Sequence, residues 1–472
     1  MQSKFVSDSL QFILRHTVES ARISPEEKIS LVWFPTDYHT ILRHFNLDPQ
    51  LRLFVCCPSC CALYDDNDDC PDFCTFRDFS SSPPCSAHLK QTRVVCGTPV
   101  PRPVRKFAYQ ELKGWLGRML SYPDIELMLE TPLSTASSSS PNNGPWTDTF
   151  DGTFIRDLKA YNGKPFFREN GNDLRLVFSL AVDGFNPFGM KIAKGPSSVT
   201  GIYMACLNLP PDIRYDADKM YLVGVIPGPK KPSLEQINNF LRILVDELLE
   251  FWEPGVFFSR TARHRLGRVV SLAVIPLVCD VLGARQVGGF LSHAATLFCS
   301  FCLLPADMIE NLDVSSWPTR TSQEHRAHAN QWRLAKTSDK REHIAKTHGM
   351  RFSELLRLPY WDAIWFTILD SMHVHFPHAL PQHIRYIWGI SPTASAGDGN
   401  NSPTVKPPLK PSSTELRKGL KALLKERSSD RPVEIVSRSC ARPVLWHLCH
   451  EFNLRRAGTS VMLARALLEW VS

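Results

Sequence analysis

The sequence contains no long hydrophobic run. The longest apolar stretch, VVSLAVIPLV, is too short to cross a bilayer and contains a proline. The first twenty residues, MQSKFVSDSLQFILRHTVES, lack the continuous apolar core of a signal peptide. These absences predict a soluble, intracellular protein with no membrane partner.

Acidic residues are outnumbered. The 472 residues include 54 Lys and Arg against 47 Asp and Glu, which gives a net charge of +7. The length allows roughly two to four domains, and 43% hydrophobic residues are enough for a sizeable core. The positive charge is compatible with a polyanionic partner such as DNA.

Cysteine is plentiful but unevenly placed. Eight of the fourteen cysteines fall between Cys56 and Cys96, and two more form the pair Cys299 and Cys302. A disulfide framework is not expected in an intracellular chain of this size. Clustered Cys-x-x-Cys motifs therefore favour zinc, with redox chemistry as a weaker alternative because no thioredoxin-like βαβ pattern surrounds Cys299 and Cys302.

Composition divides the chain into seven segments. Linkers are recognised by Ser, Pro, Asn and Gly, and the remaining segments by their helical or strand-like periodicity. The predicted segments are an N-terminal helical segment (1–50), a Cys-rich zinc-ribbon-like segment (51–98), a helical segment (99–132), a linker (133–145), a core (146–390), a second linker (391–413) and a basic helical module (414–472).

The core has the richest pattern. Three strand-like runs, LRLVFSLAVDGF, SVTGIYMACLNLP and KMYLVGVIPG, precede an amphipathic helix, PSLEQINNFLRILVDELLEFW, and a fourth apolar run, RVVSLAVIPLVCD. Three strands, a helix and a fourth strand is the element order of a ribonuclease H-like α/β core. Asp183 and Asp280 follow the first and fourth runs, and a pair of carboxylates can bind the two metal ions used in phosphoryl transfer. Asp183 could instead cap the Gly-Phe-Asn-Pro turn that follows it.

Longer motifs resemble those of a known family. VDGFNPFG, ACLNLPPDIRY, YLVGVIPGPKKPSLEQINNFLRILVDELLEFW, LVCDVLGARQVGGFLSHAATLFCSFCLL and SELLRLPYWD are similar to transposases of CACTA (En/Spm-type) DNA transposons, particularly fungal ones. The resemblance covers roughly residues 50 to 390.

This resemblance implies a nuclear DDE enzyme that cleaves and joins DNA with Mg²⁺ (or Mn²⁺) and could act as a homo-oligomer. Asp183 and Asp280 would be the first two catalytic acids and metal ligands. The third acid is open between Glu354 and Asp370. The family's chain normally continues for hundreds of residues and carries its glutamate there, and after Asp370 this sequence has two prolines where the family has an apolar helix. We therefore expect a C-terminally truncated or degenerate copy with reduced or no activity.

Two zinc sites are expected. In the Cys-rich segment, Cys57, Cys60, Cys74 and Cys85 have the best-matched spacing, and the alternative is a set of reduced structural cysteines. In the core, the resemblance implies that Cys299 and Cys302 are half of a site. His343 and His348 could complete it, although surface histidines on a helix are the more common case.

The C-terminal module has the helix–loop–helix plan of a SAP-like domain. Its Arg455, Arg456 and Arg465 could contact DNA phosphates, and the alternative is a helical hairpin with a solvated basic face. The main functional alternative to a transposase-like enzyme is a non-enzymatic chromatin or transcription factor that a host recruited from a transposase.

Overall fold

The computed structural model describes residues 40, 49–136, 148–167, 172–186, 198–388, 411–429, 431–452, 454 and 459–471. The chain divides into two compact units, residues 1–390 and 391–472, which are described separately. The predicted N-terminal helices and most of both predicted linkers lie outside the described residues. No described helix is long and apolar enough to cross a membrane.

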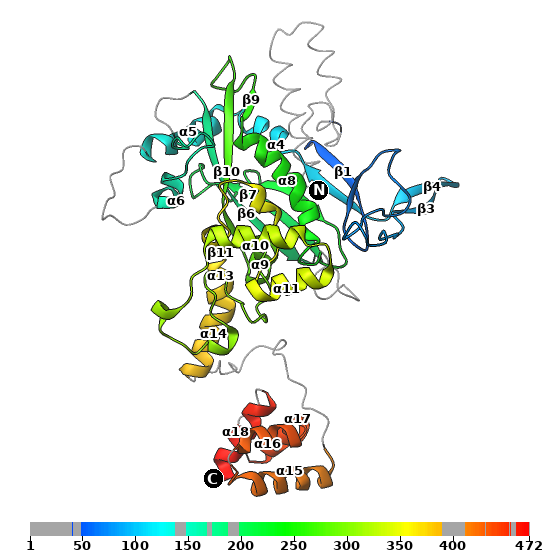
Figure 1. Ribbon diagram of the computed structural model, residues 1–472, viewed down its shortest axis with the longest axis vertical. Helices are drawn as coiled ribbons and strands as arrows, with labels where there is room; N and C mark the ends of the chain where they lie inside the picture. Colours follow the sequence, from blue (N-terminus) through cyan, green and yellow to red (C-terminus); the bar gives the residue numbers. More distant parts are fainter. Residues whose placement is uncertain are drawn as a thin grey trace, which may run out of the picture. The chain divides into compact units, whose positions relative to one another are not determined.

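The first unit is built on one mixed sheet of nine strands (Figure 1). Eight strands follow the order β11-β10-β6-β7-β8-β5-β1-β2, and β9 pairs with β10. Strands β10, β6 and β11 run parallel to one another, whereas the pairs on the other side of β6 are antiparallel. The strands are β1 (Leu51–Cys56), β2 (Leu63–Asp65), β5 (Lys106–Gln110), β6 (Leu174–Phe185), β7 (Val199–Cys206), β8 (Tyr221–Ile226), β9 (Val256–Phe258), β10 (Arg268–Cys279) and β11 (Thr367–Leu369).

The central strands are those with the longest apolar runs. Seven consecutive residues at the start of β6 are buried, as expected for a strand covered on both faces. The three predicted strands, the following helix α8 (Ile237–Trp252) and the fourth predicted strand are confirmed as β6, β7, β8, α8 and β10.

Helices cover the sheet and close its core. The apolar side of α8 packs on β10, and its Phe240 meets Phe107 of β5 with ring centroids 4.9 Å apart. Helix α4 (Leu112–Met119) places Trp115 against Phe178 of β6, at a centroid distance of 6.1 Å. Helix α5 (Pro123–Ala136) also contacts β6.

The helix predicted over 99–132 is wrong at its start. Residues Thr98–Pro103 form β4, which pairs with β3 (Lys90–Val95) in a separate two-stranded sheet, and residues 106–110 form β5. Alternate prolines at 99, 101 and 103 cannot supply the N–H groups of a helix. In β5, Phe107 and Tyr109 alternate with more exposed residues and join the Cys-rich segment to the main sheet.

A largely helical insertion separates β10 from β11. It contains α9 (Val281–Gly288), α10 (Ser322–Leu334), α11 (Ser338–His348) and α12 (Ala363–Phe366). After β11 the chain is helical from Ser371 to Ile387, so the two prolines do not stop a helix there. The π-helical turns His375–Ala379 and His383–Ile387 shift the hydrogen-bond pattern, an arrangement that relieves the loss of a proline N–H.

The second unit has four described helices. Its core is formed by buried residues that include Leu445, Leu448, Leu463 and Leu467, and the partly buried Leu454 packs against them. The helices are α15 (Ser413–Glu426), α16 (Pro432–Ser439), α17 (Arg442–Glu451) and α18 (Ser460–Val471).

Candidate functional site

Three aspartates lie at the same edge of the main sheet. Asp183 is near the end of β6, Asp280 directly follows β10, and Asp370 directly follows β11. These strands are parallel neighbours, so their carboxyl ends meet at one edge. The backbone N–H of Asp370 donates to the carbonyl oxygen of Cys279 at 2.8 Å, and the N–H of Val182 donates to Cys279 Sγ at 3.2 Å.

The pKa of the Cys279 thiol reflects the negative charge at this edge of the sheet. Burial is the main reason why its pKa rises to about 12, and the negative charges of Asp280, Asp183 and Asp370 raise it further. The carboxylates of Asp183, Asp280 and Asp370 therefore all lie near enough to the buried Cys279 thiol to raise its pKa. We call this group of three aspartates the acidic edge.

A pocket of about 400 Å³ opens at the acidic edge. Asp183 and Asp280 line it together with Lys231, Arg285 and other residues of the β8–α8 connection and α9. The arrangement combines carboxylates that can bind a divalent cation with cationic side chains that can meet an anionic substrate.

Two of the three aspartates also cap helices. An oxygen of Asp280 accepts from the N–H of Gly283 at 2.5 Å, and one of Asp370 accepts from the N–H of Met372 at 2.9 Å. Asp183 is exposed, and its carboxylate accepts no hydrogen bond from another described residue. Strand β6 continues through Phe185, and the end of the turn that Asp183 could alternatively cap lies outside the described residues.

Two neighbours of Asp183 were not among the site residues predicted from the sequence. Tyr203 lies beside it, and burial followed by the charge of Asp183 raises the pKa of Tyr203. The tyrosine ring crosses Gly201, where a Cβ atom would lie 2.2 Å from the Tyr203 oxygen. Lys231 lies against Gly184, with its Nζ 2.8 Å from where a Cβ would stand. The run GPKKP between β8 and α8 was the only available signal for this lysine.

Glu354, the other candidate for the third acid, lies elsewhere. Its carboxylate pairs with Arg357 at 3.1 Å in a short helical turn that packs on α8. Neither Glu354 nor Asp370 lines the described pocket beside Asp183 and Asp280, but only Asp370 follows a strand that is parallel to β10 and next to it.

Four of the eight clustered cysteines converge. The sulfurs of Cys57, Cys60, Cys74 and Cys85 all lie within 4.8 Å of one another. The Sγ atoms of Cys57 and Cys85 are 3.8 Å apart, and those of Cys60 and Cys74 are 3.4 Å apart. Four thiolates bound tetrahedrally to zinc at about 2.3 Å would lie roughly 3.8 Å apart, so this donor set fits the ion.

The backbone supports the same cluster. The N–H groups of Ser59 and Cys60 point to Cys57 Sγ at 3.4 and 3.5 Å, and the hydroxyl of Tyr64 lies 3.2 Å from Cys74 Sγ. Hydrogen bonds to metal-binding sulfurs orient them and balance their charge. The four cysteines that the sequence favoured are the same four that the fold brings together.

The second expected zinc site is not assembled in the described part of the chain. Arg320 binds the carbonyl oxygens of Cys299 and Cys302 at 2.9 and 3.1 Å, and its other arm binds the carbonyl oxygen of His348 at 2.8 Å. The ring of His348 stacks on His328 at 3.5 Å rather than pairing with His343. No group of ligand atoms that all lie within 4.8 Å of one another, among the described residues, includes these side chains or the three aspartates of the acidic edge together.

The predicted DNA-binding arginines are only partly described. Arg465 is exposed on α18, whereas Arg455 and Arg456 lie outside the described residues.

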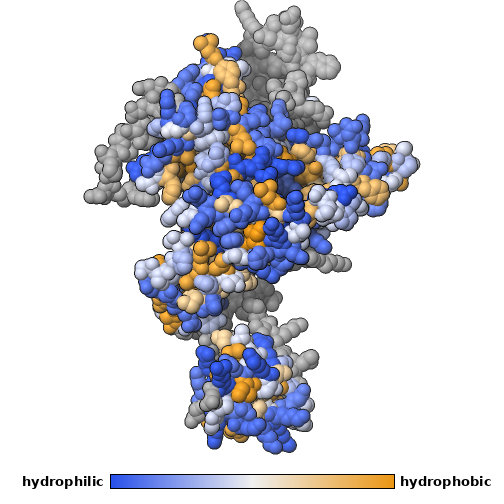
Figure 2. Space-filling model, viewed as in Figure 1, coloured by the Kyte–Doolittle hydropathy of each residue, from blue (hydrophilic) through white to orange (hydrophobic). Residues whose placement is uncertain are grey.

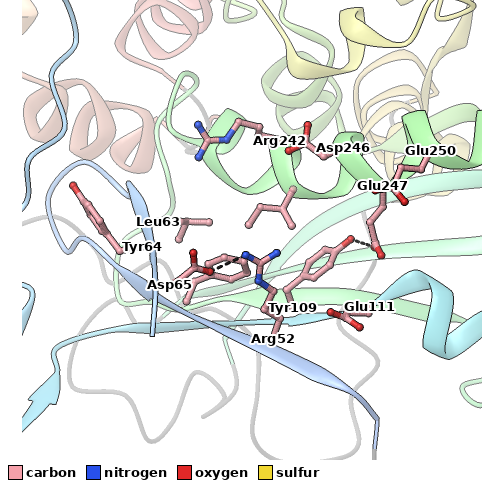
Figure 3. A pocket seen from close by; sticks show the side chains of 12 residues that line it. Arg52, Leu63, Tyr64, Asp65, Tyr109, Glu111, Arg242, Asp246, Glu247 and Glu250 are labelled. Atoms are coloured by element: carbon pink, nitrogen blue, oxygen red, sulfur yellow. Dashed lines mark hydrogen bonds and ion pairs between the residues drawn. The ribbon is translucent and has the colours of Figure 1, made fainter. Parts of the chain in front are cut away.

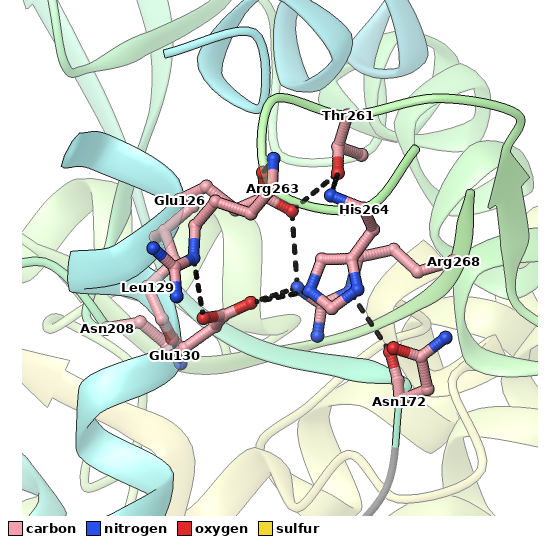
Figure 4. A network of polar contacts seen from close by, with 9 residues as sticks. All are labelled: Glu126, Leu129, Glu130, Asn172, Asn208, Thr261, Arg263, His264 and Arg268. Atoms are coloured by element: carbon pink, nitrogen blue, oxygen red, sulfur yellow. Dashed lines mark hydrogen bonds and ion pairs between the residues drawn. The ribbon is translucent and has the colours of Figure 1, made fainter. Parts of the chain in front are cut away.

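A second acidic cluster lies between α5 and the β9–β10 connection (Figure 4). Glu126 is fully buried and accepts from Thr261 Oγ1 and the N–H of Arg263, both at 2.7 Å. Glu130 pairs with Arg263, His264 and Arg268, and Arg268 also binds Glu126 at 3.2 Å. Two arginines already neutralise the two glutamates, so we assign this Glu–Arg network to structure rather than to metal binding.

The larger pocket, of about 680 Å³, separates β1, β2 and β5 from α8 (Figure 3). Most of its charged side chains already have partners: Arg52 pairs with Asp65 at 2.8 Å, Asp246 pairs with Arg357, Glu250 pairs with Lys113, and Glu247 accepts from the Tyr109 hydroxyl. Burial raises the pKa of Glu247. Side-chain amides at the start of α8 join the Cys-rich segment to the core, since Gln236 donates to the carbonyl oxygen of Ser59 at 3.0 Å and Asn239 to that of Cys60 at 3.2 Å.

The comparisons with known proteins match the part of the core that contains two of the three aspartates. Residues 149–343 match the family model Transposase_21, described as transposase family tnp2. The match contains Asp183, Asp280 and the pocket, and it supports a transposon-derived origin and a role on DNA. No curated protein matches the chain significantly.

Proposed function

We propose that this protein is a transposon-derived DNA-binding protein of the CACTA type whose core has a ribonuclease H-like fold of the DDE class. The order β8-β7-β6-β10-β11, with β7 antiparallel and the other four strands parallel to one another, supports this assignment. The observation that carries the proposal is that Asp183, Asp280 and Asp370 lie at the carboxyl ends of three neighbouring parallel strands.

The acidic edge would bind two divalent ions, Mg²⁺ or Mn²⁺. Carboxylate oxygens are the ligands that these hard cations prefer, and Asp183 has no competing hydrogen bond from another described residue. When bound, such ions activate a water and stabilise the oxygen that leaves the phosphodiester. Lys231 and Arg285 would hold the DNA phosphate in the pocket. Asp370, rather than Glu354, takes the role of third acid.

The test is nicking of supercoiled plasmid DNA by the purified chain with Mg²⁺ or Mn²⁺. We expect Asp183→Asn, Asp280→Asn and Asp370→Asn to abolish nicking, and Glu354→Gln and the exposed control Asp307→Asn to retain it. Loss with Glu354→Gln but not Asp370→Asn would reverse the assignment of the third acid. Nicking that survives both Asp183→Asn and Asp280→Asn would overturn the metal site.

A non-enzymatic DNA-binding protein is the second candidate. Asp280 and Asp370 cap helices, so both have a structural reason to persist without catalysis. DNA binding without nicking by the wild-type chain in either metal would favour this function. Both functions imply a nuclear protein.

We further propose that Cys57, Cys60, Cys74 and Cys85 bind one zinc ion that stabilises the Cys-rich segment. Elemental analysis should find one zinc per chain, which Cys57→Ser and Cys74→Ser should lose. Cys70→Ser changes a neighbouring buried cysteine outside the quartet and should keep the metal. Folded wild-type protein without zinc would contradict the site.

A further inference from the structure

The β3–β4 ribbon pairs with no other strand in the rest of the described unit. It forms its own two-stranded sheet, and all residues from Gln91 to Pro99 are exposed (Figures 1 and 2). An isolated pair of strands is marginally stable in water. This ribbon is anchored at its base, where buried Leu89 accepts from Val104 and donates to Asp72, both at 2.8 Å. Asp72 lies two residues before Cys74, so the cysteine cluster supports the ribbon.

The strand register gives the ribbon two different faces. Gln91 pairs with Arg102 and Arg93 with Val100, so both arginines share one face. The opposite face carries the pairs Lys90–Pro103, Thr92–Pro101 and Val94–Pro99, and Val94 is 73% exposed. One face is therefore basic, whereas the other is mainly apolar.

The ribbon and its flanking residues carry positive charge only, apart from histidine. Residues 79–110 contain five Lys and Arg and no Asp or Glu. Lys90 and Lys106 pair with Asp72 and Asp66 at the base, at 3.2 and 2.6 Å. Arg93 and Arg102 form no ion pair with a described residue, so their charges are available to an anionic partner.

The outer edge of β4 cannot pair with a strand of another protein. Its prolines at 99, 101 and 103 occupy alternate positions and supply no N–H groups, so another strand cannot extend the sheet there. The two faces of the ribbon and the outer edge of β3 remain available to a partner. Narrow basic ribbons fit DNA grooves, and apolar side chains such as proline can pack against base steps in the minor groove.

We propose that the β3–β4 ribbon enters a groove of duplex DNA, with Arg93 and Arg102 on the phosphates and the Val94 and proline face against the groove wall. The inference rests on the proposed action on DNA and adds the surface that holds the duplex.

The experiment compares the salt dependence of duplex DNA binding by the full chain and its variants. Each lost phosphate contact lowers the slope of log K against log salt by about 0.9. Arg93→Ala/Arg102→Ala should therefore reduce the slope by roughly 2, and Arg93→Lys/Arg102→Lys should largely restore it. Lys336→Ala/Lys340→Ala removes the same charge from exposed positions near the start of α11 and should leave the slope unchanged.

The outcomes separate this inference from the proposed function. A wild-type chain that nicks or binds DNA while the ribbon variant keeps its full slope would overturn only the ribbon. Equal losses in the Lys336 and Lys340 control would show a general charge effect and would also overturn it. If the ribbon variant instead changes the sedimentation of the protein alone, the ribbon is a protein interface. Failure of the wild type to bind any DNA would remove both proposals. Unchanged zinc content verifies that the ribbon variants are folded.

Discussion

Two acidic clusters in the first unit differ in how their charge is balanced. In the Glu–Arg network, Arg263 and Arg268 pair directly with Glu126 and Glu130. At the acidic edge, three aspartates lie at the ends of neighbouring strands, and Lys231 and Arg285 line the pocket without an ion pair to the described carboxylates. A carboxylate neutralised inside the protein holds elements together, whereas one left open can bind a cation. Composition alone does not separate the two cases.

The largest effect should follow from breaking the Glu–Arg network. Glu126→Ala removes the acceptor of Thr261 and leaves Arg268 with only Glu130, and loss of one partner in a buried pair costs about 3–5 kcal/mol. Chemical denaturation should show this loss in the free energy of unfolding. Exposed Glu310→Ala should have almost no effect. If Glu126→Ala is as stable as the wild type, the network is not the brace that we infer.

At the acidic edge we expect a smaller effect, and it is an increase in stability when Mg²⁺ is added. Mg²⁺ at about 100 times its Kd should stabilise the wild type by about 2.7 kcal/mol, because only the folded chain presents the site. Thermal unfolding should therefore shift upward by several degrees with Mg²⁺. Asp183→Asn should abolish the shift while changing stability little in the absence of metal, since its carboxylate is exposed.

The control for this shift is a change in the other cluster. Glu130→Gln should respond to Mg²⁺ as the wild type does, because its partners are arginines and a histidine. If Glu130→Gln loses the shift and Asp183→Asn keeps it, the roles of the two clusters are exchanged.

The sequence predicted the parts of the acidic edge that depend on local pattern. Runs of apolar residues located β6 and β10, and the aspartate at the end of each was visible directly. Asp370 was only one of two candidates, because its place beside Asp280 depends on parallel pairing between β10 and β11 across a long insertion. The three residues of β11 are too short to give a strand signal.

The same limit applies to the other sites. Cys57, Cys60, Cys74 and Cys85 could be selected from spacing because one short segment contains them all. The Glu–Arg network joins residues more than 130 positions apart, and no local pattern connects Glu130 to Arg268. The β5 strand was mistaken for a helix because its alternation covers only five residues next to a true helix.

The smallest predicted effect is a change in the pH dependence of stability when the Glu–Arg network is altered. Burial alone would raise the pKa of Glu130, but hydrogen bonds from His264 and Arg268 and the charges of Arg268 and Arg263 lower it below the ordinary value of 4.5. A carboxyl group whose pKa is lower in the folded state stabilises the fold above its unfolded pKa and loses that contribution as the pH falls through the folded pKa. Denaturation of the wild type between pH 7 and pH 3 should therefore show a loss of stability that starts near pH 4.5, and Glu130→Gln should reduce this loss. The same change at Glu310 should leave the profile unaltered, because that side chain is exposed. Identical acid profiles for Glu130→Gln and the wild type would mean that the arginines do not neutralise this carboxylate, and the distinction between a closed and an open acidic cluster would fail.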